Sequence, residues 1–359
     1  MRVLILFGGR SAERDVSCVS AAAIVRHLGR HQPLLVRIEP SGRWRFQRDP
    51  QAFAHHPKPA AFRFDRTPAR LEGVPDPALV VGGGHGPASR RLRFDVVFPA
   101  LHGPLGEDGT MQGLLEIAGV PYVGCDVLGS SVSMDKAITK RLAREAGLPV
   151  LPCAVLDRPA DASRVRGLRY PVFVKPARLG SSVGVYKVRG PAGLPAAVRK
   201  AFRFDTTVIV EQGVDAREIE CAVLGATQAP RASVVGEIRP KAEFYSYEAK
   251  YLDPDGAELL VPAALPAGQS ERVRTLAVRA FRALGCYGMA RVDFLLDRRS
   301  GKLWFNEANT IPGFTAISMY PKLWGASGLG FTRLIDRLLS LAVARHRRRE
   351  SLRITRDMK

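Results

Sequence analysis

The chain has 359 residues, of which 54 are Lys or Arg and 34 are Asp or Glu, so its formal net charge is +20. Hydrophobic residues make up 46% of the sequence and charged residues 25%, a balance that can bury a sizeable core and excludes a disordered or fibrous protein. No apolar stretch approaches the roughly 20 residues of a membrane span, and the N-terminal MRVLILFGGR is typical of a first strand, not of a secretory signal.

The N-terminal part of the sequence alternates apolar strands with helices, which is typical of an α/β architecture. Residues 1–125 are predicted to form one domain. Its expected elements are the strands Val3–Phe7 and Phe94–Ala100 and the helices Ser11–Leu28 and Met111–Ala118. Residues 40–93, rich in Pro, Gly and Arg, are interpreted as an irregular or hairpin-bearing insertion outside the core.

Two further domains, residues 126–211 and 212–344, and a basic tail, residues 345–359, are predicted beyond the first. The expected helices open at Ser133–Lys136, at Gln269 and at Thr332. The expected strands are Tyr170–Lys175, Val185–Val188, Thr207–Glu211, Glu218–Leu224, Met289–Leu296 and Lys302–Asn309.

The positive charge by itself suggests an anionic partner such as nucleic acid or a membrane surface. More than half of the excess lies in residues 40–93 and 345–359, without a recognisable pattern of interleaved aromatic and basic residues. A solvated basic face and a frayed tail are therefore favoured, and no specific nucleic-acid partner is expected. The five cysteines are scattered and lack CxxC spacing, as expected for reduced thiols in a cytosolic protein.

Two acids and an asparagine are predicted on one face of a hairpin near the C-terminus. Side chains alternate along a strand, so Arg291 shares a face with Asp293, and Glu307 shares one with Asn309. If the turn at 297–301 pairs the two strands antiparallel, these side chains converge. Oxygen ligands beside a basic group suit Mg²⁺, completed by phosphate and water. A solvated polar face with ordinary ion pairs is the alternative.

Lys175 is followed by the loop Gly180-Ser181-Ser182-Val183-Gly184 between two strands. The N–H groups and hydroxyls of such a loop can close over phosphates while a lysine supplies compensating charge. It is not a Walker A loop, because GxxxxGK[ST] is absent and a strand follows. A plain hairpin turn is the alternative.

Glu13 and His102 each follow an apolar strand of the first domain. In an open α/β sheet the carboxyl ends of the strands form the crevice where ligands bind. The alternatives are that Ser11 and Glu13 serve the start of a helix and that His102 is a hydrogen-bonded loop residue.

In order, seven segments resemble the D-alanine–D-alanine ligases of the ATP-grasp superfamily. They are GGRSAERDVS (8–17), LHGPLGEDGTMQGLLE (101–116), SMDKAITKRL (133–142), VKPARLGSSVGV (174–185), FYSYEAKY (244–251), RVDFLLD (291–297) and NEANTIPGFTAISMYPKLW (306–324). The resemblance implies a three-domain ATP-grasp fold, in which residues 1–125 form an open parallel-sheet domain and the two α+β lobes, 126–211 and 212–344, clamp ATP.

The resemblance also implies roles for single residues. Those expected to act in catalysis are Glu13, Ser181, Tyr251, Arg291, Gly313 and Ser318, with His102 and Met319 binding substrate. Those expected to bind ATP are Lys136, Lys175, Gly180, Ser182, Glu211, Gly213, Val214, Glu218 and Lys250. Two Mg²⁺ or Mn²⁺ ions are expected on Asp293, Glu307 and Asn309.

Within this set, the family pattern implies that Glu13 fixes the ammonium of the first D-alanine in a hydrogen-bonded trio with Ser181 and Tyr251. Arg291 and the N–H of Gly313 match the donors to the oxyanion. Ser318 and Met319 match the carboxylate pocket of the second D-alanine, and the residue types at Tyr251 and Met319 favour D-alanine over D-lactate there.

The implied activity is ATP-dependent ligation of two D-alanines through a D-alanyl phosphate, giving ADP and phosphate, for peptidoglycan precursor synthesis. A cytoplasmic homodimer is expected. The alternatives are an ATP-grasp ligase with another second substrate, such as D-lactate or D-serine, and a nucleic-acid or anionic-surface binder with an incidental fold.

Overall fold

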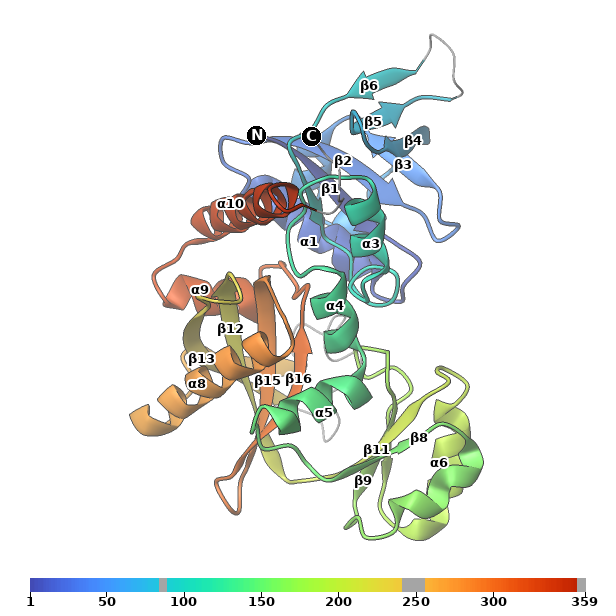
Figure 1. Cartoon of the computed structure of the whole chain (residues 1–359), viewed down its shortest axis with the longest axis vertical. Coiled ribbons are helices and arrows are strands. Elements are labelled where there is room, and N and C mark those ends of the chain that lie inside the picture. Colours follow the sequence, from blue (N-terminus) through green and yellow to red (C-terminus); the bar gives the residue numbers. More distant parts are fainter. Residues whose placement is uncertain (84–88, 241–255, 354–359) are drawn as a thin grey trace. The chain divides into compact units, whose positions relative to one another are not determined.

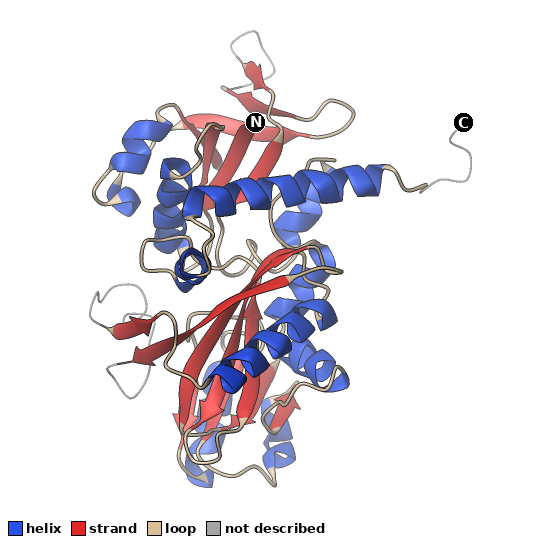
Figure 2. Cartoon of the chain, turned by 90° about the vertical axis from the view of Figure 1, so that its left-hand side faces the viewer, coloured by secondary structure: helices blue, strands red, loops and turns tan. Residues whose placement is uncertain are grey.

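The computed structural model describes residues 1–83, 89–240 and 256–353, and the chain divides into two compact units. Unit 1 comprises Met1–Val127, Tyr287–Met289 and Ile311–Lys359, and unit 2 comprises Leu128–Cys286 and Ala290–Thr310. Figure 1 labels most of the elements along the chain, and Figure 2 distinguishes helices from strands. No helix in the described part of the chain combines the length and apolarity needed to cross a membrane.

Among the described residues, unit 1 is built on a seven-stranded sheet with the order β6-β5-β4-β3-β2-β1-β7. The strands are β1 (Arg2–Gly8), β2 (Gln32–Ile38), β3 (Trp44–Gln47), β4 (Thr67–Glu72), β5 (Ala78–Val81), β6 (Arg90–Leu92) and β7 (Val96–Pro99). The helices are α1 (Arg14–Arg26), α2 (Pro50–His55), η1 (Pro59–Ala61), α3 (Thr110–Ile117), α9 (Met319–Ala326) and α10 (Phe331–Glu350). Strands β2, β1 and β7 are parallel, and the others pair antiparallel.

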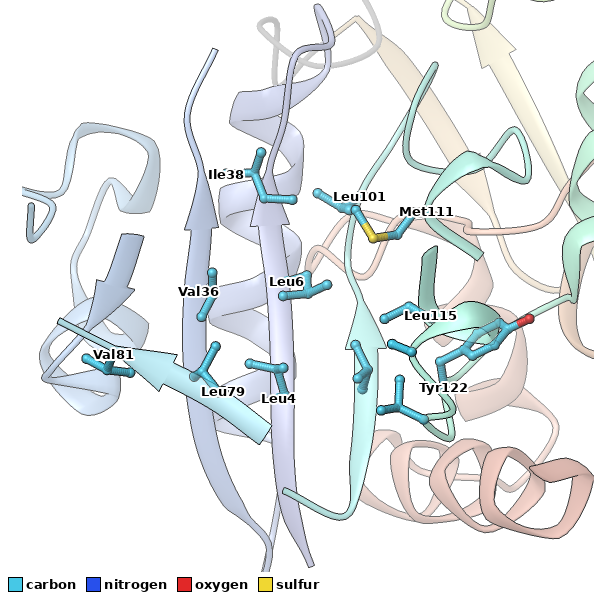
Figure 3. Close-up of a cluster of buried hydrophobic side chains, with 13 residues drawn as sticks. Leu4, Leu6, Val36, Ile38, Leu79, Val81, Leu101, Met111, Leu115 and Tyr122 are labelled. Atoms are coloured by element: carbon cyan, nitrogen blue, oxygen red, sulfur yellow. The ribbon is translucent and has the colours of Figure 1, made fainter. Parts of the chain in front are cut away.

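The apolar side chains of β1 alternate between the two faces of this sheet. Leu6 packs in a cluster with Met111 and Leu115 of α3 on one face (Figure 3). Phe7, on the other face, meets Phe53 of α2 with their ring centroids 4.9 Å apart. A strand covered by helices on both faces requires the continuous apolar run seen in the sequence.

The prediction that residues 40–93 lie outside the core is wrong. This segment supplies β3 to β6, which extend the parallel strands into an antiparallel half-sheet. Leu79 is fully buried and lies in the same cluster as Leu4 and Val36 (Figure 3). The strands are short and carry arginines, for example Arg91, which contacts Asp76 at the surface. Apolar residues between these arginines, such as Leu92, pack against the core, and the polar composition of the segment conceals them.

Helix α10 continues through Glu350, so the start of the predicted basic tail, residues 345–350, is helical and not frayed. Arg345 is only 9% exposed. Its guanidinium donates to the carbonyl oxygens of Gly124 and Tyr122 and lies 4.2 Å from the centre of the Tyr122 ring. At this position the basic composition serves packing within unit 1.

Replacing Arg345 by alanine is expected to lower the free energy of unfolding by about 2–4 kcal/mol, because it leaves buried carbonyl groups without their charged donor. Arg347, exposed on the same helix, provides the control, and its alanine variant should change stability by no more than about 0.5 kcal/mol. Denaturant unfolding of both variants measures the difference. Equal effects would contradict a structural role for Arg345.

Among the described residues, unit 2 contains a four-stranded sheet, β10-β9-β11-β8, and a five-stranded sheet, β14-β13-β12-β15-β16. The strands are β8 (Cys153–Leu156), β9 (Val172–Pro176), β10 (Tyr186–Val188), β11 (Val208–Gln212), β12 (Ala216–Gly225), β13 (Arg231–Pro240), β14 (Ala257–Leu260), β15 (Gly288–Asp297) and β16 (Leu303–Asn309). The helices are α4 (Val127–Met134), α5 (Lys136–Glu145), η2 (Pro159–Val165), η3 (Pro191–Gly193), α6 (Leu194–Ala201) and α8 (Ala267–Ala283).

Candidate active site

Glu13 lies at the carboxyl end of β1, against the loop that follows β7. These strands are parallel neighbours, so their carboxyl ends open at the same edge. Glu13 is 8% exposed, and its side chain makes no capping bond to α1. A Cβ atom on Gly103, which has φ +78°, would lie 2.5 Å from Ser11 Oγ and 2.8 Å from a Glu13 carboxylate oxygen. The β7 loop can therefore approach the Glu13 carboxylate only with glycine at position 103.

His102 joins the end of β7 to the segment that carries Gly313. The His102 ring contacts the carbonyl oxygen of Ile311 through Nδ1 and the Ser20 hydroxyl through Nε2, both at 3.0 Å. Because a carbonyl only accepts, Nδ1 carries the proton. The Phe314 N–H donates to the same Ser20 oxygen at 3.3 Å. This buried histidine thus orders the loop on which the predicted oxyanion donor lies.

Gly313, Ser318 and Met319 lie together at the N-terminus of α9. A Cβ atom on Gly313 would lie 2.5 Å from Ser318 Oγ, and the Thr315 N–H donates to that hydroxyl at 3.0 Å. Ser318 is the N-cap residue of α9, yet its side chain makes no capping bond. The positive end of a helix favours a carboxylate, which agrees with the acceptor pocket predicted at Ser318 and Met319.

In unit 2, Lys136 begins helix α5, where the Asp135 carboxylate accepts from the first N–H groups of the helix. Lys136 Nζ donates to the carbonyl oxygen of Leu179 at 2.6 Å and lies 3.7 Å from Glu307 Oε2. The lysine therefore connects the start of the glycine loop with the predicted metal ligands.

The glycine loop contains consecutive left-handed residues, Ser181 with φ +51° and Ser182 with φ +61°, followed by Gly184 with φ +72°. Left-handed conformations are unusual for residues other than glycine and concentrate where a loop binds a ligand. A Cβ atom on Gly184 would lie 2.9 Å from Pro176 Cγ. Gly180 accepts from the Val183 N–H at 3.1 Å, so the loop turns back on itself tightly.

Glu211 is 3% exposed and lies between two lysines. Lys175 Nζ donates to Glu211 Oε2 at 2.6 Å, and Lys140 Nζ contacts Glu211 Oε1. Burial alone would raise the pKa of Glu211, but the two ammonium groups outweigh it and lower the pKa to about 2. The carboxylate of Glu211 is thus occupied by lysines, and Lys140 is a member of this cluster that the sequence prediction missed.

The predicted hairpin of β15 and β16 is confirmed, with Asp293 opposite Glu307 and Arg291 opposite Asn309. Arg291 donates to both carboxylate oxygens of Asp293, at 2.8 and 2.7 Å. Its Nε also lies 3.1 Å from an oxygen of Glu220 on β12, which the sequence prediction did not include. Two neighbouring carboxylates fix the guanidinium.

The donor set of this hairpin suits a hard cation. In the described ranges no three His, Cys, Asp or Glu side chains gather as a metal site, so the set consists of the carboxylates of Asp293 and Glu307 and one amide. Asn309 Nδ2 donates to Asp293 Oδ2 at 3.0 Å, which leaves the Asn309 carbonyl oxygen for coordination. Each carboxylate oxygen has a second lone pair, so Mg²⁺, which takes oxygen ligands, fits these residues.

The segment after β11 carries the residues predicted to read adenine. The Gly213 N–H donates to the carbonyl oxygen of Pro171 at 2.7 Å, so an adenine contact through Gly213 would use its carbonyl oxygen. Val214 and Glu218 are half-buried, and Glu218 pairs with Ile238 in the β12–β13 ladder. Lys250 and Tyr251 lie outside the described residues.

Two family models match the chain: the D-ala D-ala ligase N-terminus over residues 2–125 and the D-ala D-ala ligase C-terminus over residues 142–340. A D-alanine–D-alanine ligase A of Bradyrhizobium diazoefficiens is 51% identical, over 98% of this chain and 97% of the relative. The D-alanine–D-alanine ligase A of Escherichia coli K12 is 45% identical, over 99% of both chains.

Among solved structures, the D-alanine–D-alanine ligase from Coxiella burnetii matches with a TM-score of 0.84 and 35% identity, over 98% of this chain and 96% of that one. Such ligases have the ATP-grasp fold, so the predicted fold class is confirmed. The two family models and the full-length relatives agree. The chain therefore belongs to the D-alanine–D-alanine ligase family.

Proposed function

We propose that this chain uses ATP to join two D-alanines into D-alanyl-D-alanine, releasing ADP and phosphate, as a step in making peptidoglycan precursors. The observation that carries the proposal is the polar face of β15 and β16, where Arg291 is fixed beside a set of oxygen ligands. The relatives at 45% and 51% identity are named for this ligation and match nearly the whole chain.

In the proposed first step, a carboxylate oxygen of the first D-alanine attacks the γ-phosphorus of ATP and ADP leaves. The residues that would hold the phosphates are Lys136, Lys175 and the loop 180–184, and Lys250 belongs to the same set. Asp293, Glu307 and Asn309 would hold two Mg²⁺ or Mn²⁺ ions, which when bound supply positive charge to the phosphate oxygens. These residues would act mainly by positioning the carboxylate against the γ-phosphate and by neutralising the charge of the phosphates.

In the proposed second step, the amine of the second D-alanine attacks the carbonyl carbon of the D-alanyl phosphate, and phosphate leaves. Arg291 and the Gly313 N–H would stabilise the oxyanion. Ser318 and the N–H of Met319 would hold the carboxylate of the second D-alanine. Glu13, with Ser181 and Tyr251, would bind the ammonium of the first.

The role of Glu13 leads to a prediction at Gly103. Replacing Gly103 by alanine should raise the KM for the first D-alanine at least ~10-fold, because the new methyl group must displace the Ser11 hydroxyl and the Glu13 carboxylate. Gly113→Ala is the control, since a Cβ atom there meets nothing within 4 Å. The KM for ATP should change little in either variant. A rise confined to ATP would contradict the placement of the amino acid at Glu13.

Product identification by mass spectrometry, after incubation with ATP, Mg²⁺ and D-alanine, tests the function. D-alanyl-D-alanine is the expected product, and competing D-serine or D-lactate should be incorporated far less. This comparison matters because a D-Ala:D-Ser ligase, VanG from Enterococcus faecalis, also matches the fold, with a TM-score of 0.82 and 34% identity, over 95% of this chain and 99% of that one. Phosphate release only with another acceptor would contradict the proposal.

We also propose a homodimer that acts in the cytoplasm, where ATP and the amino acid are supplied. Helix α3 exposes two apolar side chains, Leu114 and Ile117, which supports an interface between copies. Light scattering after size exclusion tests the dimer, and Ile117→Asp should shift it towards monomer.

A further inference from the structure

Lys140 is a buried cation to which the proposed mechanism gives no task. It lies on α5, one turn after Lys136, and is 1% exposed. Its ammonium contacts one carboxylate oxygen of Glu211 and lies 3.3 Å from the carbonyl oxygen of Asn306 on β16. Burying a lysine is unfavourable unless it is paired, so its place beside the nucleotide residues calls for a physical reason.

The two oxygens of Glu211 are divided between two lysines. One oxygen contacts Lys140 and the other accepts from Lys175, so a single carboxylate pairs two buried cations. The single negative charge of Glu211 therefore faces two positive charges, one more than is required to neutralise it. With a single lysine beside it, any movement of that lysine would leave a buried and unpaired carboxylate, which is strongly unfavourable.

Of the two lysines, Lys175 is the one proposed to hold ATP phosphates, and it lies near the end of β9, the strand that precedes the glycine loop. To give its charge to a phosphate, its ammonium must be shared with, or drawn away from, Glu211 Oε2, which it now contacts at 2.6 Å. Glu211 can release it without losing its counter-ion only because Lys140 remains on the other oxygen.

We propose that Lys140 is a positioning residue for nucleotide binding: it keeps the Glu211 carboxylate paired and so frees the Lys175 ammonium for the phosphates of ATP. This inference rests on the proposed use of ATP at Lys175. It assigns Lys140 no contact with substrate, and it makes the effect of Lys140 depend on Glu211.

The test compares four variants of the full chain: Lys140→Met, Glu211→Gln, the double variant Lys140→Met/Glu211→Gln, and Lys200→Met as an exposed control on α6. In Lys140→Met, Lys175 stays on Glu211, so the KM for ATP and the Kd for ADP should rise at least ~10-fold. The Kd for adenosine and the KM for D-alanine should stay within about twofold. In the double variant no carboxylate holds Lys175, so ADP should bind within about threefold of its affinity for Glu211→Gln alone, and more tightly than to Lys140→Met.

Several outcomes would overturn the inference. A Lys140→Met enzyme with less folded protein but an unchanged KM for ATP would show a structural role only. A double variant that binds ADP as weakly as Lys140→Met would show that Glu211 is not what restrains Lys175. If Lys140→Met does not fold, the ADP affinity of the double variant is compared with that of Glu211→Gln. A much weaker affinity in the double variant would contradict the inference. A parent enzyme that binds ADP but makes no dipeptide would refute the proposed function and leave this inference standing.

Discussion

Replacing Arg291 by alanine is expected to lower kcat for dipeptide synthesis by about 10²–10³-fold, the usual cost of removing one preorganised donor to an oxyanion. The guanidinium is fixed by Asp293 at 2.8 and 2.7 Å and by Glu220 at 3.1 Å. It therefore needs no reorientation when negative charge develops on the tetrahedral intermediate. Because the oxyanion exists only in the transition state, the KM for D-alanine should change much less than kcat.

Arg291→Lys is the matched variant for this experiment. It keeps the positive charge but cannot donate in a planar fork to two carboxylates, so it should recover only a small part of kcat. Steady-state ADP release and the melting temperature should be measured together, because the alanine variant also leaves Asp293 and Glu220 without their shared cation. A loss confined to the KM for ATP would contradict the oxyanion role and indicate that Arg291 only orders the metal ligands.

The face that carries Arg291 is the part of the site that sequence reasoning predicts best. Alternation along two strands and a short turn place Asp293 opposite Glu307 without any tertiary information. The same local logic places the start of α5 at Lys136, where Asp135 provides the cap. Motifs whose geometry lies within one hairpin or one helix turn are therefore recoverable from the sequence.

Residues that act through distant partners are harder to predict. Lys140 contacts Glu211 in the fold, but β8, β9 and β10 lie between them along the chain, and the local signal for Lys140 is that it follows Lys136 by one helix turn. Glu220 shares a strand face with Glu218, but its partner Arg291 lies on β15, far along the chain. The prediction of a frayed tail is wrong at Arg345 for a related reason: a basic composition cannot reveal that one guanidinium is buried against Tyr122.

The second large effect is expected at Glu307. Changing it to glutamine keeps the shape of the side chain but removes one of the two negative charges of the proposed metal set. The Mg²⁺ concentration that gives half-maximal activity should rise about 10–100-fold, and kcat at saturating Mg²⁺ should fall, since a carboxylate binds this cation more strongly than an amide. Titration of activity with Mg²⁺, after treatment with a chelator, measures both quantities.

Glu271→Gln, exposed on α8, removes the same charge from unit 2 away from the hairpin and should leave the Mg²⁺ titration unchanged. This control separates ligand loss from a general change in electrostatics. Glu307 also lies 3.7 Å from Lys136, so a pure ion-pair role predicts a different result: an altered KM for ATP with an unaltered Mg²⁺ midpoint. A shifted midpoint in Glu307→Gln alone would make this carboxylate a metal ligand, since an ion pair with Lys136 does not respond to Mg²⁺ concentration.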